Sequence, residues 1–320
     1  PNPSVDLNGG TLFLDASRLV VSNATGGVDV GTGSTLDMTG TAPTAVPEMD
    51  VEGAVSIAGG TLTLAGSAAQ IYVAGSWTHT TGTVNLSAST SIVRFDATAG
   101  APTITVPSTG TTDFTNLELS TTRTVSLGGT STVDVSGNAT VIDGDLAVGA
   151  LTLVVVGGLA VDSDNVANVP VNGVSVSTGV IRVAGDLDYA VANLQFTAAT
   201  GRVELAGGLL GGASGTLDIG AGPFLGTVEL TNTTAAQTIP AVDPFNHLEI
   251  DKQGGTPQDA TPDGGLTLQG NLLVTSGRFV ADGGAALSHT ISGTLTVTAG
   301  ATLLVQRSQV TVNNLVAPPP

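Results

Sequence analysis

Residues 263–306, DGGLTLQGNLLVTSGRFVADGGAALSHTISGTLTVTAGATLLVQ, decide the fold class of this chain. Short runs in this stretch alternate apolar and polar residues, as in Leu266-Thr267-Leu268 and Leu295-Thr296-Val297. Most of the glycines that separate the runs stand beside a Ser, Thr, Asn or Asp. Alternation at period two is typical of strands with one buried face, and Gly-polar pairs are typical of sharp turns. The stretch therefore predicts a coiling chain with one short strand on each face of a β-solenoid.

The rest of the chain repeats this pattern with variations, beginning with Leu12 and Leu14 near its start. We predict an all-β fold: a single continuous β-solenoid (parallel β-helix) over residues 1–320, with Gly, Asn and Asp corners and essentially no helix. Irregular segments interrupt the alternation, and some of them are rich in proline. They predict protruding loops near residues 41–50, 100–112, 162–170 and 252–265.

Internal repetition supports the same fold. GTVNL at 82–86 recurs as GRVEL at 201–205 and GTVEL at 226–230, and FTNLELS at 114–120 recurs as FNHLEID at 245–251. A Gly-Asn pair follows each of the two longer motifs, at Gly137-Asn138 and at Gly270-Asn271. These landmarks fit a period of roughly 20–25 residues, which predicts roughly 13–16 coils. Phe114 and Phe245 should then occupy equivalent inward positions.

Composition restricts the partners of such a protein. The chain of 320 residues has 41% hydrophobic but only 3% aromatic residues, so the core must consist of Val, Leu, Ile and Ala. It has 8 Lys+Arg against 26 Asp+Glu, a net charge of −18, which disfavours nucleic acid as a partner. The longest apolar run, residues 147–161, contains glycines and is shorter than the ~20 residues of a membrane helix. We therefore predict no transmembrane segment.

Two further features concern the chain's surroundings. There is no Cys, which excludes disulfide scaffolds and thiolate metal sites. The chain starts at Pro1 without a preceding Met and shows no leader-like segment. We therefore expect either a protein whose leader has been removed or a fragment of a longer one.

The order of the motifs resembles a group of secreted bacterial surface proteins. F-x-N-L-x-[LI], a turn, and then G-N-L-x-V resembles the repeats of autotransporter-like passengers and filamentous adhesins, which are known or predicted parallel β-helices. The best matches are 114–119 and 245–250, followed by 270–274. The resemblance implies a secreted, extracellular, cell-surface location and cell-surface glycans as possible partners. Its motifs consist of core and corner residues, so it implies fold more than function.

A search for catalytic groups finds little. His79, His247 and His289 are isolated in the sequence, and we interpret them as surface or turn residues. The serious enzymatic alternative is a glycan-active β-helix enzyme, which needs clustered carboxylates and Arg on one face. The Arg residues are dispersed along the sequence, and pairs such as Asp143/Asp145 fit turns. We predict that the protein is not an enzyme and has no cofactor.

Other sequence features point only weakly to a function, and most of them also have a structural interpretation. Asp162, Asp164 and Asn165 place oxygen ligands in one loop and make a weak calcium site, or a plain Asx-turn. Thr pairs such as Thr61/Thr63 resemble ice-binding arrays, but we expect them to be out of register between coils and to be ordinary strand residues. Trp77 and Tyr72 fit either a sugar-binding patch or core packing. Four Asn-x-Ser/Thr sequons permit glycosylation, with their asparagines at 23, 85, 138 and 232.

Three functions remain in order of preference. The first is an extracellular structural subunit that polymerises head-to-tail into a filament or sheath, with itself as the partner. The second is the rod segment of a large surface adhesin, and the third is the glycan-active enzyme. Neither end of the sequence shows a polar capping repeat, so the terminal strands should be open to another chain. The predicted self-assembly residues are Val5, Leu7, Leu12, Leu14, Val310, Val312 and Leu315.

Overall fold

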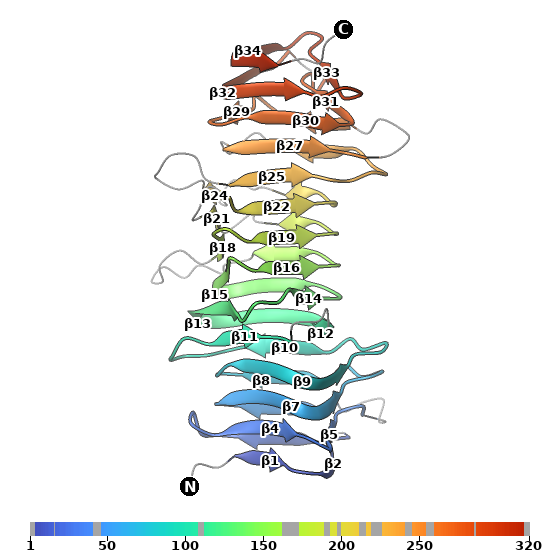
Figure 1. The fold of residues 1–320 in the computed structure, drawn as a ribbon, viewed down its shortest axis with the longest axis vertical. Coiled ribbons are helices and arrows are strands. Elements are labelled where there is room, and N and C mark those ends of the chain that lie inside the picture. Colours follow the sequence, from blue (N-terminus) through green and yellow to red (C-terminus); the bar gives the residue numbers. More distant parts are fainter. Residues whose placement is uncertain are drawn as a thin grey trace. The chain divides into compact units, whose positions relative to one another are not determined.

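The structure is a computed structural model, and it confirms the predicted fold class. It describes residues 4–15, 17–40, 46–107, 112–161, 173–188, 193–196, 200–210, 216–218, 226–240, 245–253, 259–284 and 286–316. These residues are all-β without helix, about 60% strand, and their parallel strands form a β-solenoid of about 11 turns. Within each of the two units described below, Figure 1 shows the strands of successive coils stacked in chain order. The part of the chain that the structure describes contains no helix long and apolar enough to cross a membrane.

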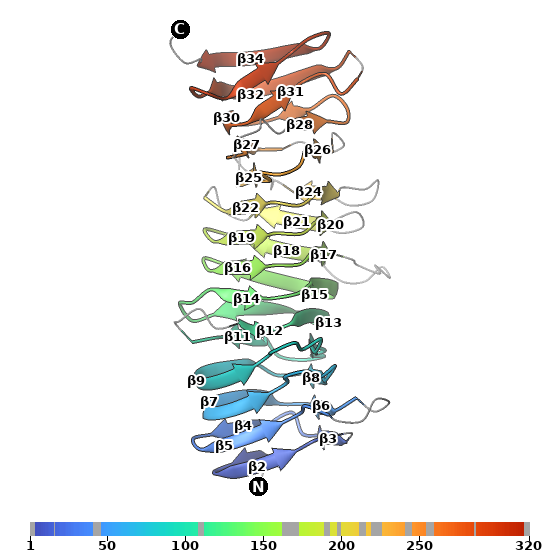
Figure 2. The same ribbon diagram turned by 90° about the vertical axis from the view of Figure 1, so that its right-hand side faces the viewer.

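The chain divides into two compact units. Unit 1 comprises Pro1–Gly157 and Ser163–Gly173, and unit 2 comprises Gly158–Asp162 and Val174–Pro320. The prediction of one continuous solenoid over residues 1–320 stays a prediction. Figure 2 gives the view after a quarter turn, in which each unit again shows its own stacked strands.

In unit 1, successive coils return the chain to the same faces. One face carries β1, β4, β11 and the first parts of β7 and β9, and a second carries β2, β5 and the second parts of β7 and β9. A third carries β3, β6, β8, β10 and the start of β13. The strands of unit 1 are β1 (Val5–Leu7), β2 (Gly10–Phe13), β3 (Arg18–Val21), β4 (Gly27–Gly31), β5 (Ser34–Asp37), β6 (Glu48–Val51), β7 (Ala54–Thr63), β8 (Gln70–Val73), β9 (Trp77–Asn85), β10 (Ile92–Phe95), β11 (Thr103–Thr105), β12 (Thr112–Phe114), β13 (Asn116–Gly128), β14 (Val133–Val135), β15 (Ala139–Gly149) and β16 (Thr152–Val155).

Unit 2 is built in the same way, and its described strands pair in parallel. Its longest face stacks β19, β22, β25, β27, β30, β32 and β34, and β26, β28, β31 and β33 form another. The strands of unit 2 are β17 (Leu159–Val161), β18 (Gly173–Val176), β19 (Val180–Val183), β20 (Leu187–Asp188), β21 (Asn193–Phe196), β22 (Arg202–Leu205), β23 (Leu209–Leu210), β24 (Thr216–Asp218), β25 (Thr227–Leu230), β26 (Gln237–Ile239), β27 (His247–Asp251), β28 (Asp259–Pro262), β29 (Thr267–Leu268), β30 (Leu272–Ser276), β31 (Arg278–Val280), β32 (Ser288–Val297), β33 (Thr302–Leu304) and β34 (Gln309–Val316).

Alternation along each strand builds the core. In β4, Val28 and Val30 are buried while their neighbours are half-buried, and β22 repeats this with Val203 and Leu205. Because successive coils are in register, these side chains stack in columns inside the solenoid. Residues opposite one another in neighbouring coils lie from 19 positions apart (Asp259 and Arg278) to 30 (Arg18 and Glu48). Coils longer than predicted are one reason why there are about 11 turns instead of 13–16.

The recurring Gly-Asn pair has a steric origin. The Asn116 side chain lies over Gly137 of the next coil, where an added Cβ would meet its Oδ1 at 2.6 Å. The same Oδ1 accepts a hydrogen bond from the backbone N–H of Asn138. In unit 2, His247 lies over Gly270, where an added Cβ would meet its ring at 2.6 Å, and its Nδ1 accepts from the N–H of Asn271. The repeat alignment is therefore correct at these corners.

The same alignment places the two motif phenylalanines correctly. Phe114 and Phe245 are both fully buried, as predicted. His247, two positions after Phe245, lies on the outward side of β27 and is half-buried.

The predicted loops are shorter than expected where the structure describes them. Strand β6 starts at Glu48 within the predicted loop 41–50, β11 lies within 100–112, and β28 lies within 252–265. Prolines and glycines next to these strands masked the short alternating runs in the sequence. The predicted loop at 162–170 lies outside the described residues.

Candidate functional site

The first coil of unit 1 leaves inward-facing side chains uncovered. Val5 and Leu12 are in register with the fully buried Val28 and Leu36 of the next coil, but they are only half-buried themselves. Leu7 is also half-buried, whereas Leu14 is buried. Strands β1, β2 and β3 pair with β4, β5 and β6, and the described residues offer them no partner on the other side. The predicted assembly residues at this end therefore belong to an open coil.

The last described coil of unit 2 is open as well. Leu315 continues the column of Leu248, Leu272 and Leu295, which are 0–2% exposed, yet Leu315 is 57% exposed. Val310 and Val312 on the same strand are half-buried. Among the described residues, β34 pairs with β32, β33 pairs with β31, and neither has a second neighbour.

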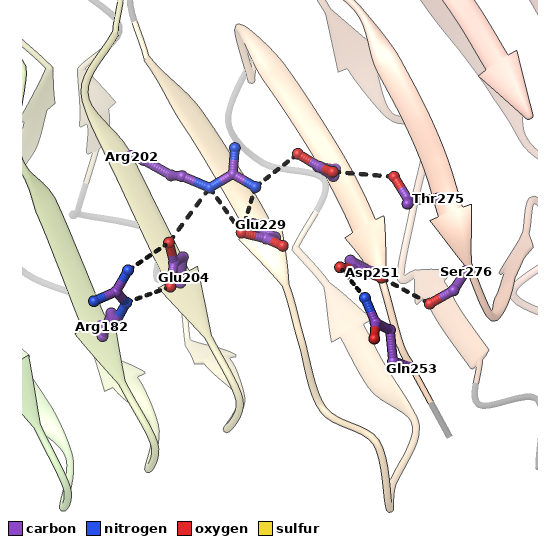
Figure 3. Close-up of polar contacts among 9 residues, drawn as sticks. Arg182, Arg202, Glu204, Glu229, Asp251, Gln253, Thr275 and Ser276 are labelled. Carbon is purple, nitrogen blue, oxygen red and sulfur yellow. Dashed lines mark hydrogen bonds and ion pairs between the residues drawn. The ribbon is translucent and has the colours of Figure 1, made fainter. Parts of the chain in front are cut away.

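A ladder of charged side chains runs along one outer face of unit 2 (Figure 3). Strand register places Arg182, Glu204, Glu229 and Glu249 at the same position of four successive strands, β19, β22, β25 and β27. Three glutamates thus stack directly on one another. We call Arg182, Arg202 and these glutamates the charge ladder.

Arg202 compensates the stacked glutamates. Its Nε donates to Glu229 at 2.7 Å, its Nη2 donates to Glu249 at 2.8 Å, and Nε lies 3.6 Å from Glu204. Arg182 Nε donates to Glu204 at 2.6 Å. Burial raises the pKa of the Glu229 carboxyl, the nearby Glu249 and Glu204 add to the rise, and Arg202 opposes it. The ladder therefore ties coils together through one cation that several carboxylates share.

Sequence reasoning missed this cluster. The dispersed arginines were an argument against an enzyme, because glycan-active β-helices need carboxylates and Arg on one face. The structure brings two arginines and three glutamates together on such a face. The signal was present in GRVEL, GTVEL and HLEI, since aligning these motifs stacks their glutamates. Each of these glutamates is bound by an arginine, so the arrangement fits a structural tie between coils.

The histidine interpretation was wrong for two of the three residues. His79 and His289 are fully buried, because core positions of a solenoid can accept polar rings when partners exist. His289 Nδ1 accepts from the N–H of Leu266 at 3.1 Å, and its Nε2 lies 2.7 Å from the carbonyl of Ala281. His79 Nδ1 lies 2.8 Å from Asp113 Oδ1, also fully buried.

Lys252 is another buried charged residue. Its side chain is 1% exposed, and its Nζ donates to the carbonyl of Ala235 at 3.1 Å. Burial lowers the pKa of Lys252 to about 8, and Asp259 partly opposes this. The Lys252 amine thus links the turn at residues 232–235 to the segment that directly follows β27.

The remaining predictions have mixed outcomes. Trp77 is fully buried, so it is a core residue and cannot contribute to a sugar-binding surface, whereas Tyr72 is half-buried beside Arg94. The expectation that threonine pairs such as Thr61/Thr63 are out of register between coils holds for Thr63, which is opposite Asp37 and Asn85, but is wrong for Thr61. Thr11, Thr35, Thr61 and Thr83 are in register on four successive coils of unit 1.

The weak calcium site predicted from the sequence stays a prediction. Asp162, Asp164 and Asn165 lie outside the described residues. Within the described ranges, no group of three or more His, Cys, Asp or Glu could hold a metal ion.

Comparisons with known proteins found no relative of this chain. No family model matches the chain, and neither a curated protein nor a solved structure matches it. The resemblance to secreted bacterial surface repeats therefore stays a prediction.

Proposed function

We propose that the chain is an extracellular structural protein, a β-solenoid subunit that polymerises head-to-tail into a filament or sheath. In this proposal the partner is a second copy of the chain, and the contact is strand pairing between the last coil of one copy and the first coil of the next. Parallel strands stack in one direction along a solenoid, so joining unlike ends continues the stacking. A contact between unlike surfaces need not close and naturally builds a fibre.

The observation that carries the proposal is the exposed end of a core column. Leu315 is 57% exposed although Leu295, its in-register neighbour, is 2% exposed. An apolar core residue with an unpaired edge strand around it is a template for another strand. The half-buried Val5 and Leu12 offer apolar side chains at the other open coil. Pairing would bury both sets and add main-chain hydrogen bonds, as in β-augmentation.

The extracellular location rests on the resemblance to secreted surface repeats and on composition. A chain without Cys and with a net charge of −18 fits an exposed fibre kept in solution by charge repulsion. The charge ladder supports a mechanical role, because it links four successive coils on one face.

The test uses the direction of the backbone groups in β34. The N–H of Gln309 bonds to the carbonyl of Leu287, and N–H groups alternate in direction along a strand. The N–H groups of Val310 and Val312 therefore point away from β32, towards the open side. The variant V310P/V312P removes these two donors from the free edge and leaves the pairing with β32 in place. The matched control V310A/V312A shortens the same side chains and keeps both donors.

The expected result is that the parent and V310A/V312A form filaments in electron micrographs and sediment as polymers, whereas V310P/V312P remains monomeric. Circular dichroism of all three proteins should show the same β content. Equal assembly of the proline variant and the alanine control would refute pairing through this edge.

The second candidate is the rod segment of a large surface adhesin. The same exposed Leu315 favours it, because further coils of a longer chain would cover this column equally well. The two candidates differ in solution. A rod segment should stay monomeric at all concentrations, whereas a polymerising subunit should assemble as concentration rises.

A further inference from the structure

The first and last described coils carry apolar side chains on their outward sides. In unit 1, Phe13 of β2 and Val20 of β3 are 67% and 50% exposed. In unit 2, Val316 of β34 is 46% exposed, and Leu304 of β33 lies half-buried on the outward side. The structure describes seven exposed large hydrophobic residues, and four of them belong to these two coils. Outward apolar side chains are therefore concentrated where a coil is open.

Neighbouring coils mostly carry polar residues at the same outward positions. Opposite Phe13, successive coils of unit 1 place Asp37, Thr63 and Asn85. Opposite Val20, they place Asp50, Tyr72 and Arg94. In unit 2, Thr296 is opposite Val316, whereas the residue opposite Leu304 is the apolar Val280. At three of the four positions, the residue of the open coil is therefore apolar while its neighbour in the next coil is polar.

Both open coils carry three strands that follow one another around the solenoid in the same order. In the first coil, Asn8 and Gly9 form the corner between β1 and β2, and β3 comes next. In the last coil, β33 comes first, and β34 then bends near Asn313. The first half of β34, residues 309–312, pairs with the first part of β32, and the second half, residues 314–316, pairs with its second part. A first coil laid on a last coil can therefore match strand to strand in three rotations.

One rotation places β1 on the first half of β34 and β2 on the second half. The inward Leu12 then covers Leu315, which joins the core columns of the two copies. Side chains alternate along a strand, so Phe13 lies on Val316 on the outward side. Two exposed apolar side chains thus meet outside the core.

The same rotation places β3 on β33. Leu19 and Leu303 face inward on these strands, since both are opposite fully buried residues of the neighbouring coils. With Leu19 on Leu303, the next residues, Val20 and Leu304, lie on each other on the outward side. All four outward apolar residues of the open coils thus form two outer pairs.

The other two rotations break these pairs. In one of them Phe13 lies against the first half of β34, and in the other Val20 does. The outward residues of that half are the polar and exposed Gln309 and Thr311. The first rotation instead places Asp6, the outward residue of β1, on Thr311. Only the first rotation therefore pairs all four apolar residues with one another.

We propose that two copies join in this single rotation, with Phe13 of one copy on Val316 of its neighbour and Val20 on Leu304. This inference rests on the proposed head-to-tail assembly and adds the rotation of one copy against the next. Burial of the two outer pairs removes apolar surface from water at the joint. A rotation that sets Phe13 or Val20 against polar residues loses part of this gain, so the outer pairs select one rotation.

Cysteine cross-linking tests the rotation. The chain has no Cys, so each of four variants carries a single thiol: Phe13→Cys, Val20→Cys, Leu304→Cys and Val316→Cys. Neighbouring strands lie ~4.8 Å apart, which is within the Cα separation that a disulfide spans. Copies with a thiol in the first coil are mixed with isotope-labelled copies that carry one in the last coil. After oxidation with diamide, mixed disulfide dimers are identified by their mass.

The expected result is a mixed dimer for the pairs 13/316 and 20/304 and none for 13/304 or 20/316. A dimer confined to 13/304 or to 20/316 would overturn the proposed rotation, because each belongs to one of the other two rotations. Sedimentation of the parent separates this failure from a failure of the proposed function. A parent that polymerises while no expected dimer forms contradicts the rotation alone. A parent that stays monomeric contradicts head-to-tail assembly and the rotation together.

A second measurement needs no thiol. Phe13→Ala removes most of one outer pair and should raise the concentration at which the full chain assembles by at least about tenfold. Val156 is 59% exposed and belongs to neither open coil, so Val156→Ala is the control and should leave this concentration unchanged. Equal assembly of the two variants would refute the outer pair of Phe13 and Val316.

Discussion

Leu295 and Leu315 occupy consecutive positions of one core column in unit 2, but Leu295 is 2% exposed and Leu315 is 57% exposed. The two side chains have the same chemistry and the same register. The difference between them is that β34 covers Leu295 while no described strand covers Leu315. The solenoid therefore continues its core pattern to an open coil, which is the basis of the proposed assembly.

Substitution of Phe245 tests the repeat alignment and the core. Phe245 is fully buried, so Phe245→Ala should lower the free energy of unfolding by about 3–5 kcal/mol through lost burial and a cavity. Phe13 is 67% exposed, and Phe13→Ala should change stability by less than about 0.5 kcal/mol. Urea unfolding followed by circular dichroism measures both. Equal effects of the two variants would show that the buried position of Phe245 is wrong.

Gly270→Ala tests the packing of His247 over Gly270. The new Cβ would lie 2.6 Å from the ring of His247 and 2.8 Å from the backbone oxygen of Asn246. We expect a loss of about 1–3 kcal/mol in the free energy of unfolding, because the ring can move but the backbone cannot easily do so. In a His247→Ala background the same change should cost less. A double-mutant cycle that shows no coupling would contradict the stacking of His247 on Gly270.

Arg202→Met tests the charge ladder. When the guanidinium of Arg202 is removed, Glu229 and Glu249 stack as uncompensated like charges. We expect a loss of roughly 1–3 kcal/mol at neutral pH. The loss should shrink in acid as Glu229, whose pKa is raised by burial, gains a proton. Arg278→Met, which removes a one-to-one pair with Asp259 at the surface, is the control and should cost less at neutral pH. A deficit of Arg202→Met that does not change with pH would exclude the electrostatic origin.

Lys252 predicts a pH dependence of stability on the alkaline side. Its pKa is lowered from 10.5 to about 8 by burial, so between these values the unfolded chain binds more protons than the folded chain. The free energy of unfolding should therefore rise with pH across this window and be independent of Lys252 below it, with a total rise of at most about 3 kcal/mol. Unfolding in urea at several pH values measures the slope. Lys252→Met should abolish it, and a variant that keeps the slope would assign it to another group.

The fold was predictable from the sequence because period-two alternation and glycine corners are local signals. The stacking of Asn116 on Gly137 and of His247 on Gly270 was already visible as a recurring Gly-Asn pair. The inward direction of Asp113 was not predictable, because a bulge of one residue changes it and no pattern marks the bulge. The charge ladder depends on coil lengths, which vary from 19 to 30 residues. Only aligned strands show which glutamates stack.

The most direct test of head-to-tail assembly measures which ends meet. The chain has no Cys, so Ser17→Cys in the first coil and Thr311→Cys in the last described coil give single labelling sites at exposed positions. Copies with a donor dye at position 17 are mixed with copies that carry an acceptor at position 311, and energy transfer is recorded as concentration rises. The account predicts transfer in this mixture and none when donor and acceptor both sit at position 17 or both at position 311. Transfer confined to the like-end mixtures, or absent from all of them, would contradict it.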